Sequence, residues 1–310
     1  MPGAYAHITM VNIAHGLVRR DADTPANVRI ASSDYLKFVE LGGVSPDYPY
    51  LDALSGSASS WADDMHYTNT TDMIKSGAAR VAKMQGGLQT KCLAWLLGYA
   101  AHVAGDVTIH PIVEGKVGEY KTHKKQHRVC EMHQDAYIYT ERMKLGAIGL
   151  SEHLDSTTSG IMSCHRSDDP SRIDEAILDL WMGMFEDVYP DAFATQPPNI
   201  DSWHAKFGPR VDIIEEGDAL PPFAHHIAAS QGLTYPEAAD LEEFINALET
   251  PEGEMTYDVI FDRACTNIIA LWRKIGLAVE TDNIDTLADL TSWNLDTGKD
   301  ETGTFVYWTV

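Results

Sequence analysis

The sequence predicts an all-α protein, a multi-helix bundle with extra helices at its C-terminal end. Two observations support this fold class: apolar residues recur at three- and four-residue spacings, and alternating strand patterns are nearly absent. The chain has 310 residues, 44% of them hydrophobic, which is enough for a substantial core. The predicted helical segments are 76–106, 130–144, 171–189, 234–248 and 257–279.

The chain divides into three parts by composition. We expect a core over residues 1–187, a connecting segment over 188–222, and C-terminal helices over 223–310 that pack on the core and end in an extended tail or short strand. A second segment rich in Pro, Gly and Asp, 45–61, predicts an ordered loop within the core.

Net charge and cysteine content limit the classes of partner and site that the sequence supports. The formal charge of −23 repels phosphate backbones and makes nucleic-acid binding unlikely, although such acidity also occurs as a solubility or high-salt adaptation. The four cysteines share no CxxC spacing, so we expect neither a disulfide framework nor a thiolate zinc site. With no secretion signal or transmembrane segment evident in the sequence, we expect a cytoplasmic protein.

A polar stripe interrupts the apolar segment 97–111. His102, Asp106 and His110 follow one another at four-residue steps, so they share one face of a helix. Burying unpaired ionisable groups costs several kcal/mol, unless a divalent cation replaces their lost hydration. A single buried histidine is usually a satisfied core residue, but three such groups at this spacing favour a metal site.

Three further clusters carry residues of the same types. His123, His127, Glu131 and Asp135 again follow four-residue steps, which fits a ligand face or a solvated helix with ion pairs, and spacing alone leaves His123 and His127 open. Asp47 and His66 flank the turn-rich loop, where Asp47 could instead be a turn aspartate and Asp63 or Asp64 a helix cap. His7 lies near the start of the chain.

The ordered set His, Asp, His, HxxxD, His and HxxxE resembles the zinc-dependent phospholipase C family, which is related to the trinuclear-zinc single-strand nucleases. The resemblance spans roughly residues 1 to 185 and implies a mostly helical fold with three metals at the bottom of a cleft. It favours His127 over His123, and it implies two to three Zn²⁺ per chain. The implied ligands are Asp47, His66, His102 and Asp106 for one zinc, His110, His127 and Glu131 for a second, and His7 with bridging Asp106 for a third.

The resemblance implies a metal-dependent phosphoesterase that hydrolyses a phosphodiester with a zinc-activated water. Asp47 is then the candidate general base, and Tyr48 and Lys124 are candidates for binding a phosphoester small molecule or lipid headgroup. Asp63 stands where choline phospholipases carry an aromatic residue, so no choline cage is expected. The alternatives are a single-strand nuclease, for which the chain offers only the basic stretch 121–125, and a non-catalytic zinc-stabilised helical binding protein.

Overall fold

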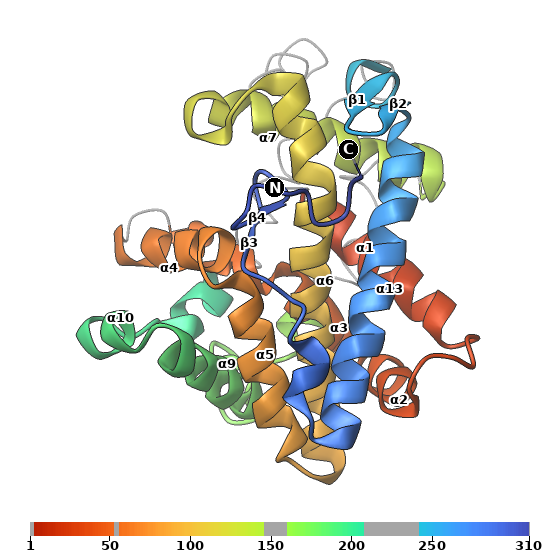
Figure 1. The fold of residues 1–310 in the computed structure, drawn as a ribbon. Helices are drawn as coiled ribbons and strands as arrows, with labels where there is room; N and C mark the ends of the chain where they lie inside the picture. The colour runs from red at the N-terminus through yellow and green to blue at the C-terminus, as the bar shows by residue number, and fades with distance from the viewer. Residues whose placement is uncertain (1–2, 53–55, 146–159, 208–241, 310) are drawn as a thin grey trace.

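A computed structural model of the chain describes residues 3–52, 56–145, 160–207 and 242–309. Along these ranges the protein is mostly helical, which confirms the predicted all-α class (Figure 1). The α-helices are α1 (Ala4–Val18), α2 (Ala26–Asp34), α3 (Leu36–Val44), α4 (Gly56–Tyr67), α5 (Thr70–Ala82), α6 (Gly86–Val117), α7 (Tyr120–Tyr137), α9 (Glu175–Val188), α10 (Pro190–Thr195) and α13 (Tyr257–Thr281).

Short elements connect these helices. They are the 3₁₀-helices η1 (Ser45–Asp52), η6 (Glu242–Phe244) and η7 (Ile284–Leu287) and the π-helical turn η2 (Ile138–Arg142). Two small antiparallel hairpins complete the described chain: β1 (Leu248–Thr250) with β2 (Gly253–Met255), and β3 (Trp293–Asn294) with β4 (Lys299–Asp300). All four cysteines are buried, and none of them forms a disulfide.

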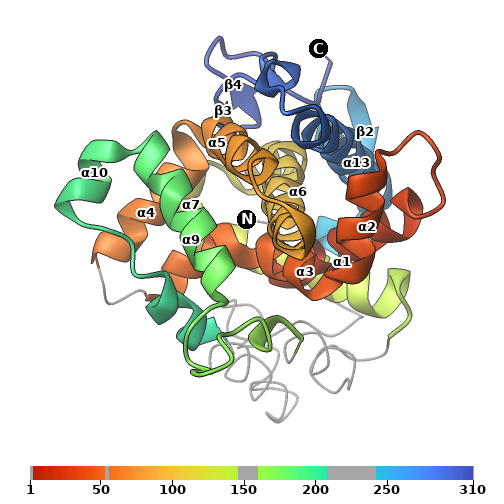
Figure 2. The ribbon, with the colours of Figure 1, turned by 90° about the horizontal axis from the view of Figure 1, so that it is seen from below.

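Helix α6 is the centre of the fold. Figure 2 shows it surrounded by α1, α3, α5 and α13, and every residue from 92 to 110 is buried. A helix that is apolar on all sides is stable in water only when neighbours cover it completely. Within the described ranges, α6 is also the one helix long and apolar enough to cross a membrane, but its apolar window lies entirely inside the structure.

Glycines allow α3 to approach α6 closely. A Cβ atom added at Gly98 would lie 1.9 Å from the Val39 carbonyl oxygen, and one added at Gly42 would lie 2.1 Å from the Trp95 carbonyl oxygen. Both obstacles are backbone atoms, which cannot rotate away as a side chain can. The crossing therefore depends on the absence of a side chain at both positions.

The structure corrects several predicted boundaries. The helix expected over 76–106 is two helices, because the chain turns at Gly86, whose φ of +61° favours glycine. The loop expected over 45–61 forms η1 and the start of α4, apart from 53–55, which lie outside the described residues. Most of the helix expected over 234–248 also lies outside them, and its described end forms η6 and the beginning of β1.

The described parts of the connecting segment and of the C-terminal region pack against the core helices. In the described half of the connecting segment, α10 and the helical residues 200–207 follow α9, and Trp203 is buried at 5.9 Å from the Trp181 ring. In the C-terminal part, α13 packs on α6, α1 and α5, and the Trp272 indole donates a 2.7 Å hydrogen bond to the Leu97 carbonyl. The C-terminal helix thus belongs to the same hydrophobic core as the central helix.

We expect Gly98→Ala to destabilise the protein by about 1–3 kcal/mol or more, because overpacking here displaces backbone. Urea unfolding followed by circular dichroism measures this change. The control is Gly115→Ala on the same helix, where an added Cβ meets no atom within 4 Å. That change should be neutral or stabilise by up to about 1 kcal/mol. Equal effects of the two changes would show that the helix crossing tolerates a side chain.

Candidate metal centre

One carboxylate lies at the centre of the candidate site. Asp106 is fully buried on α6, and imidazole nitrogens surround its two oxygens. His7 Nε2 lies 3.2 Å and His110 Nε2 3.9 Å from Asp106 Oδ1, while His102 Nε2 lies 3.2 Å and His66 Nε2 3.7 Å from Oδ2. One anion therefore faces four imidazoles in a space without exposed side chains.

Four elements bring these side chains together. The i,i+4 steps of α6 supply His102, Asp106 and His110, as their spacing predicts. His7 comes from α1 and His66 from the last turn of α4. Asp47, on η1, lies at the edge of the cluster with 21% of its side chain exposed. Its Oδ1 atom is 3.4 Å from His66 Nε2 and 3.7 Å from His102 Nε2.

Backbone carbonyls fix the orientation of two of the rings. The Nδ1 atom of His102 donates to the Gly43 carbonyl at 2.8 Å, and Nδ1 of His66 donates to the Ala62 carbonyl at 2.7 Å. Each bond places the proton on Nδ1 and leaves Nε2 as the atom that faces the cluster. This is the arrangement that metal-binding histidines usually show, with the second nitrogen held by an acceptor outside the metal shell.

His7 is placed through the first turn of α1. The Asp135 carboxylate, on α7, accepts hydrogen bonds from the backbone nitrogens of Ala6 at 2.8 Å and Tyr5 at 3.3 Å. An acceptor at a helix N-terminus satisfies amides that have no partner within the helix. Gly3 lies so near this carboxylate that a Cβ there would be 1.8 Å from it. The His7 ring then stacks on His102 with centroids 3.9 Å apart.

The atoms that face the cluster have no hydrogen-bond partner. Within the part of the chain that the structure describes, the unpartnered buried atoms include Nδ1 and Nε2 of His7, Oδ1 of Asp47, Nε2 of His66, His102 and His110, both carboxylate oxygens of Asp106, and Nδ1 of His127. Leaving so many polar atoms unsatisfied costs free energy unless a ligand pairs with them. Nitrogen and oxygen donors that converge in this way fit divalent zinc.

Two overlapping groups have the geometry of a metal site. The ligand atoms of His7, His102 and Asp106 lie within 4.8 Å of one another, and so do those of Asp47, His66 and His102. They match the positions that the resemblance implies for the first and third zincs. Each group alone offers three protein ligands, which leaves coordination positions for water or substrate oxygens.

The pKa values of the buried groups show that Asp106 interacts with more than one imidazole. Burial lowers the pKa of His7 to about 4, with the charge of His102 acting in the same direction. Burial would also lower the pKa of His102, but the charges of Asp106 and Asp47 outweigh it and raise the pKa to about 9. Despite burial, the same imidazole holds the pKa of Asp106 well below its usual value. One imidazolium thus neutralises Asp106 in the metal-free protein, a position that a cation would take instead.

His127 and Glu131 are arranged less tightly. His127 is buried on α7, its Nδ1 lies 3.9 Å from a Glu131 oxygen, and its Nε2 donates to the Gly118 carbonyl at 2.5 Å. Among the described side chains, however, the implied second set of His110, His127 and Glu131 does not converge within 4.8 Å. His123 instead uses its Nδ1 in local contacts with Glu119 and Thr122. His127 is thus buried with its Nδ1 towards Glu131, whereas the Nδ1 of His123 is used in local contacts. These positions favour His127 over His123 as the candidate ligand.

The position of Tyr48 corrects its proposed role. Tyr48 is fully buried, with its ring 5.3 Å from that of Phe207 and its hydroxyl 3.4 Å from His204 Nδ1. In a 3₁₀-helix, residues three apart share a face, so Asp47 on η1 shares its side with Tyr50 and not with Tyr48. The Tyr50 ring lies 5.6 Å from that of His66, so Tyr50 rather than Tyr48 is an aromatic residue beside the site.

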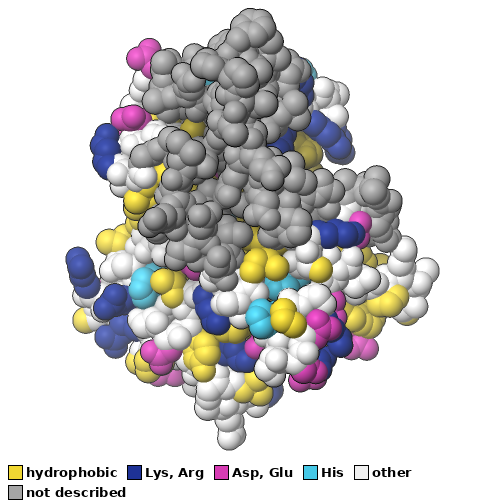
Figure 3. Space-filling view, turned by 180° about the vertical axis from the view of Figure 1, so that it is seen from behind, with side chains coloured by type: hydrophobic (Ala, Val, Ile, Leu, Met, Phe, Trp, Pro, Cys, Tyr) yellow, Lys and Arg dark blue, Asp and Glu magenta, His cyan; other side chains and the backbone are white. Residues whose placement is uncertain are grey.

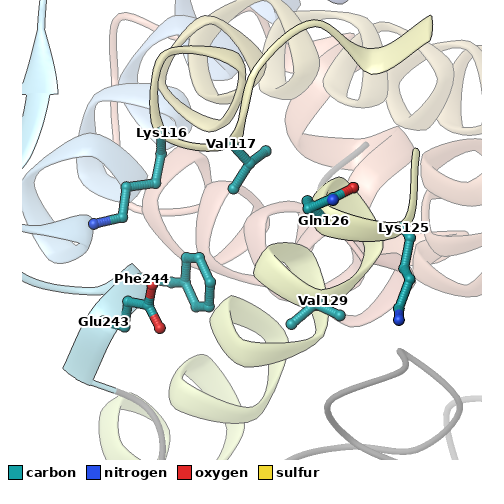
Figure 4. A pocket seen from close by; sticks show the side chains of 7 residues that line it. All are labelled: Lys116, Val117, Lys125, Gln126, Val129, Glu243 and Phe244. Atoms are coloured by element: carbon teal, nitrogen blue, oxygen red, sulfur yellow. The ribbon is translucent and has the colours of Figure 1, made fainter. Parts of the chain in front are cut away.

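Lys124 is exposed on α7. Its Nζ lies 5.5 Å from the Tyr120 ring, and that ring meets His127 edge-on at 5.3 Å. Lys124 therefore remains a substrate-binding candidate beside His127. A separate pocket of about 440 Å³ is lined by Lys116, Val117, Lys125, Gln126, Val129, Glu243 and Phe244 (Figure 4). It contains none of the predicted ligands.

One further carboxylate lies near the ligands and has no local signal in the sequence. Asp296, in the turn between β3 and β4, is 8% exposed, and its Oδ1 lies 3.5 Å from His110 Nδ1. Burial alone would raise its pKa, but His110, together with the Tyr67 hydroxyl, brings the pKa below its usual value. No local spacing connects Asp296 to the HxxxDxxxH segment, so only the folded chain shows this contact.

His127→Ala should lower the zinc content of the purified protein by about one ion per chain, because it removes an imidazole from the set next to Glu131. His123→Ala, four residues earlier on the same helix, is the control and should leave the zinc content unchanged. Elemental analysis measures both. If His123→Ala loses zinc and His127→Ala does not, the assignment of the two residues is reversed.

Removal of zinc should also lower the stability of the fold, because the unpartnered atoms lose the cation that satisfies them. A ligand present at 1,000 times its Kd stabilises by about 4 kcal/mol. Thermal unfolding with and without a chelator measures this difference. Asp106→Ala removes the central carboxylate and should abolish most of the chelator effect. A wild-type protein with the same Tm in both conditions would contradict a structural contribution of zinc.

Comparison with known proteins gives one match. A family model for zinc-dependent phospholipase C matches residues 6–191, which is more than half of the chain and contains every predicted ligand. Searches of curated proteins and of solved structures found no match. Asp296 lies outside the matched residues. The match confirms the resemblance that the ordered histidines and carboxylates indicate, and the chain belongs to the zinc-dependent phospholipase C family.

Proposed function

We propose that the protein is a zinc-dependent phosphodiesterase that acts on a small phosphoester or a lipid headgroup. The observation that carries this proposal is the convergence of unpartnered imidazole and carboxylate atoms around Asp106. Family membership supports the general class, a metal-dependent hydrolase of phosphoric esters. The ligand set contains no thiolate, and such nitrogen and oxygen ligation is typical of zinc sites that keep open positions for chemistry.

Each ligand has a place in the proposed centre. Asp47, His66 and His102 hold one zinc together with Asp106, and His7 holds another that shares Asp106. His110, His127 and Glu131 provide the remaining set, and its side chains must move closer together to share an ion. We propose two to three zinc ions per chain on this basis.

Asp47 is the proposed general base. Bound zinc would polarise the phosphoryl group and lower the pKa of a water molecule towards neutrality. Among the proposed carboxylate ligands Asp47 has the most exposed side chain, at 21% against 12% for Glu131, so it borders both the buried cluster and solvent. Although burial acts against ionisation, His102 and His66 hold its pKa below the usual value, so the carboxylate is charged and can accept a proton at neutral pH.

The surface supports a small phosphoester rather than a nucleic acid as substrate. Figure 3 shows described Lys and Arg side chains interspersed with Asp and Glu side chains on the face that it presents. The net charge of −23 opposes the approach of a polyanion, whereas one phosphodiester is held locally by the metals. Tyr50 and Lys124 are the candidates for contact with the rest of the substrate.

Asp47→Asn tests the role of the base. It should lower turnover of a generic phosphodiester by about 100-fold or more while most of the zinc stays bound. Asp52→Asn is the matched control on the same 3₁₀-helix, since Asp52 pairs with Lys206 at 2.6 Å away from the cluster. It should retain wild-type turnover. Full activity of Asp47→Asn would show that another group takes the proton.

A panel of phosphodiesters separates the proposed enzyme from a zinc-stabilised binding protein. We expect zinc-loaded wild-type protein to hydrolyse at least one member, and turnover to stop when a chelator removes the metal. A protein that binds zinc but hydrolyses no substrate in the panel would favour the non-catalytic alternative.

A further inference from the structure

The C-terminal hairpin reaches the candidate metal centre from a part of the chain beyond the family match. Figure 1 shows β3 and β4 beside α4 and α6, and β3 contacts both α4 and α5. The turn between the two strands carries Asp296, whose Oδ1 lies 3.5 Å from Nδ1 of the predicted ligand His110. The matched region ends at residue 191, so the hairpin lies outside the part of the chain that the family model covers.

Specific hydrogen bonds hold the hairpin against the elements that carry ligands. The Leu295 amide donates to the carbonyl of His66 at 2.9 Å, which joins the hairpin to the backbone of a second predicted ligand. The Thr70 hydroxyl donates to the Trp293 carbonyl at 2.8 Å. Asp296 is thus fixed by contacts on the residues directly before it.

The turn of α6 that carries His110 is shaped to receive this segment. Pro111 has no amide hydrogen, so the Val107 carbonyl cannot form its usual helical bond. Gly298, with a φ of +65°, packs at this point, and a Cβ there would lie 2.3 Å from Pro111 Cγ and 2.5 Å from the Val107 oxygen. The Trp308 indole donates to the neighbouring Thr108 carbonyl at 2.9 Å. The close approach of Gly298 brings Asp296 to His110.

The two nitrogens of His110 face different groups. Nε2 points to Asp106 and has no hydrogen-bond partner, while Nδ1 faces the Asp296 carboxylate. An imidazole whose Nδ1 proton is accepted by a carboxylate has its tautomer and ring direction fixed, and its free nitrogen becomes a better ligand. His66 and His102 use backbone carbonyls for this purpose, whereas His110 uses a side chain from the C-terminal hairpin.

We propose that Asp296 is a positioning residue of the metal centre, which accepts the Nδ1 proton of His110 and holds Nε2 towards zinc. The C-terminal region is then part of the site rather than a cover over it. This inference rests on the proposed metal centre, but it does not depend on the substrate.

Zinc affinity, measured by competition with a chromophoric chelator, tests the proposal. Asp296→Ala should weaken the binding of one zinc by about 10- to 100-fold, the usual effect of losing an outer-shell carboxylate. Asp296→Asn should fall between Asp296→Ala and wild type, because its amide oxygen still accepts the proton without the charge. In zinc-loaded wild type, ¹⁵N NMR of His110 should show a protonated Nδ1, and Asp296→Ala should change that signal.

Asn294→Ala is the matched structural control. The Asn294 side chain accepts from the amides of Asp296 at 3.1 Å and Thr297 at 3.0 Å, so it stabilises the turn without facing His110. It should lower the Tm of the zinc-free protein while changing zinc affinity by less than about 3-fold.

The outcomes separate this inference from the proposed function. If wild type binds zinc and both Asp296 variants bind it with wild-type affinity, Asp296 is not a positioning residue, while the metal centre stands. An equal loss of affinity in Asn294→Ala and Asp296→Ala would also overturn it, because the hairpin would then act only through its fold. Wild-type protein that binds no zinc would contradict the metal centre itself and remove the basis of both.

Discussion

The buried carboxylate of Asp106 is the group on which the site depends. It lies on α6, where every residue from 92 to 110 is buried, and the imidazoles of His7, His66, His102 and His110 approach it from three helices. The ring nitrogens that face Asp106 and both of its oxygens have no hydrogen-bond partner, an arrangement that fits a metal ion held at this point by the elements around α6.

The packing of α3 on α6 connects the core to the chemistry. Because Gly42 and Gly98 lack side chains, the two helices touch through their backbones. This contact places the Gly43 carbonyl 2.8 Å from His102 Nδ1, so that the tautomer of a ligand depends on a helix crossing. Helix α3 leads directly into η1, which carries Asp47. Core packing and ligand geometry are therefore set by the same contact, and a change in one affects the other.

The family match and the physical core do not end at the same residue. The matched region stops at 191, yet α13 covers α6, and the β3 and β4 hairpin contacts the elements that carry His66 and His110. Coverage of a buried cluster limits the water that would compete for the ligands and screen their charges. The C-terminal region supplies part of that coverage, and with Asp296 a polar contact to a ligand.

The sequence by itself determined the helical class and the stripe of His102, Asp106 and His110, because residues four apart on a helix share a face whatever surrounds it. It also determined the ligand order that indicates the family. Tertiary structure decided the rest. The 3₁₀ geometry of η1 places Tyr50 rather than Tyr48 on the side of Asp47. The turn at Gly86 divides one apolar run into two helices, and the packing of Gly298 on Pro111 brings Asp296 close to His110. These results depend on turn geometry and on the docking of distant segments, for which local periodicity carries no information.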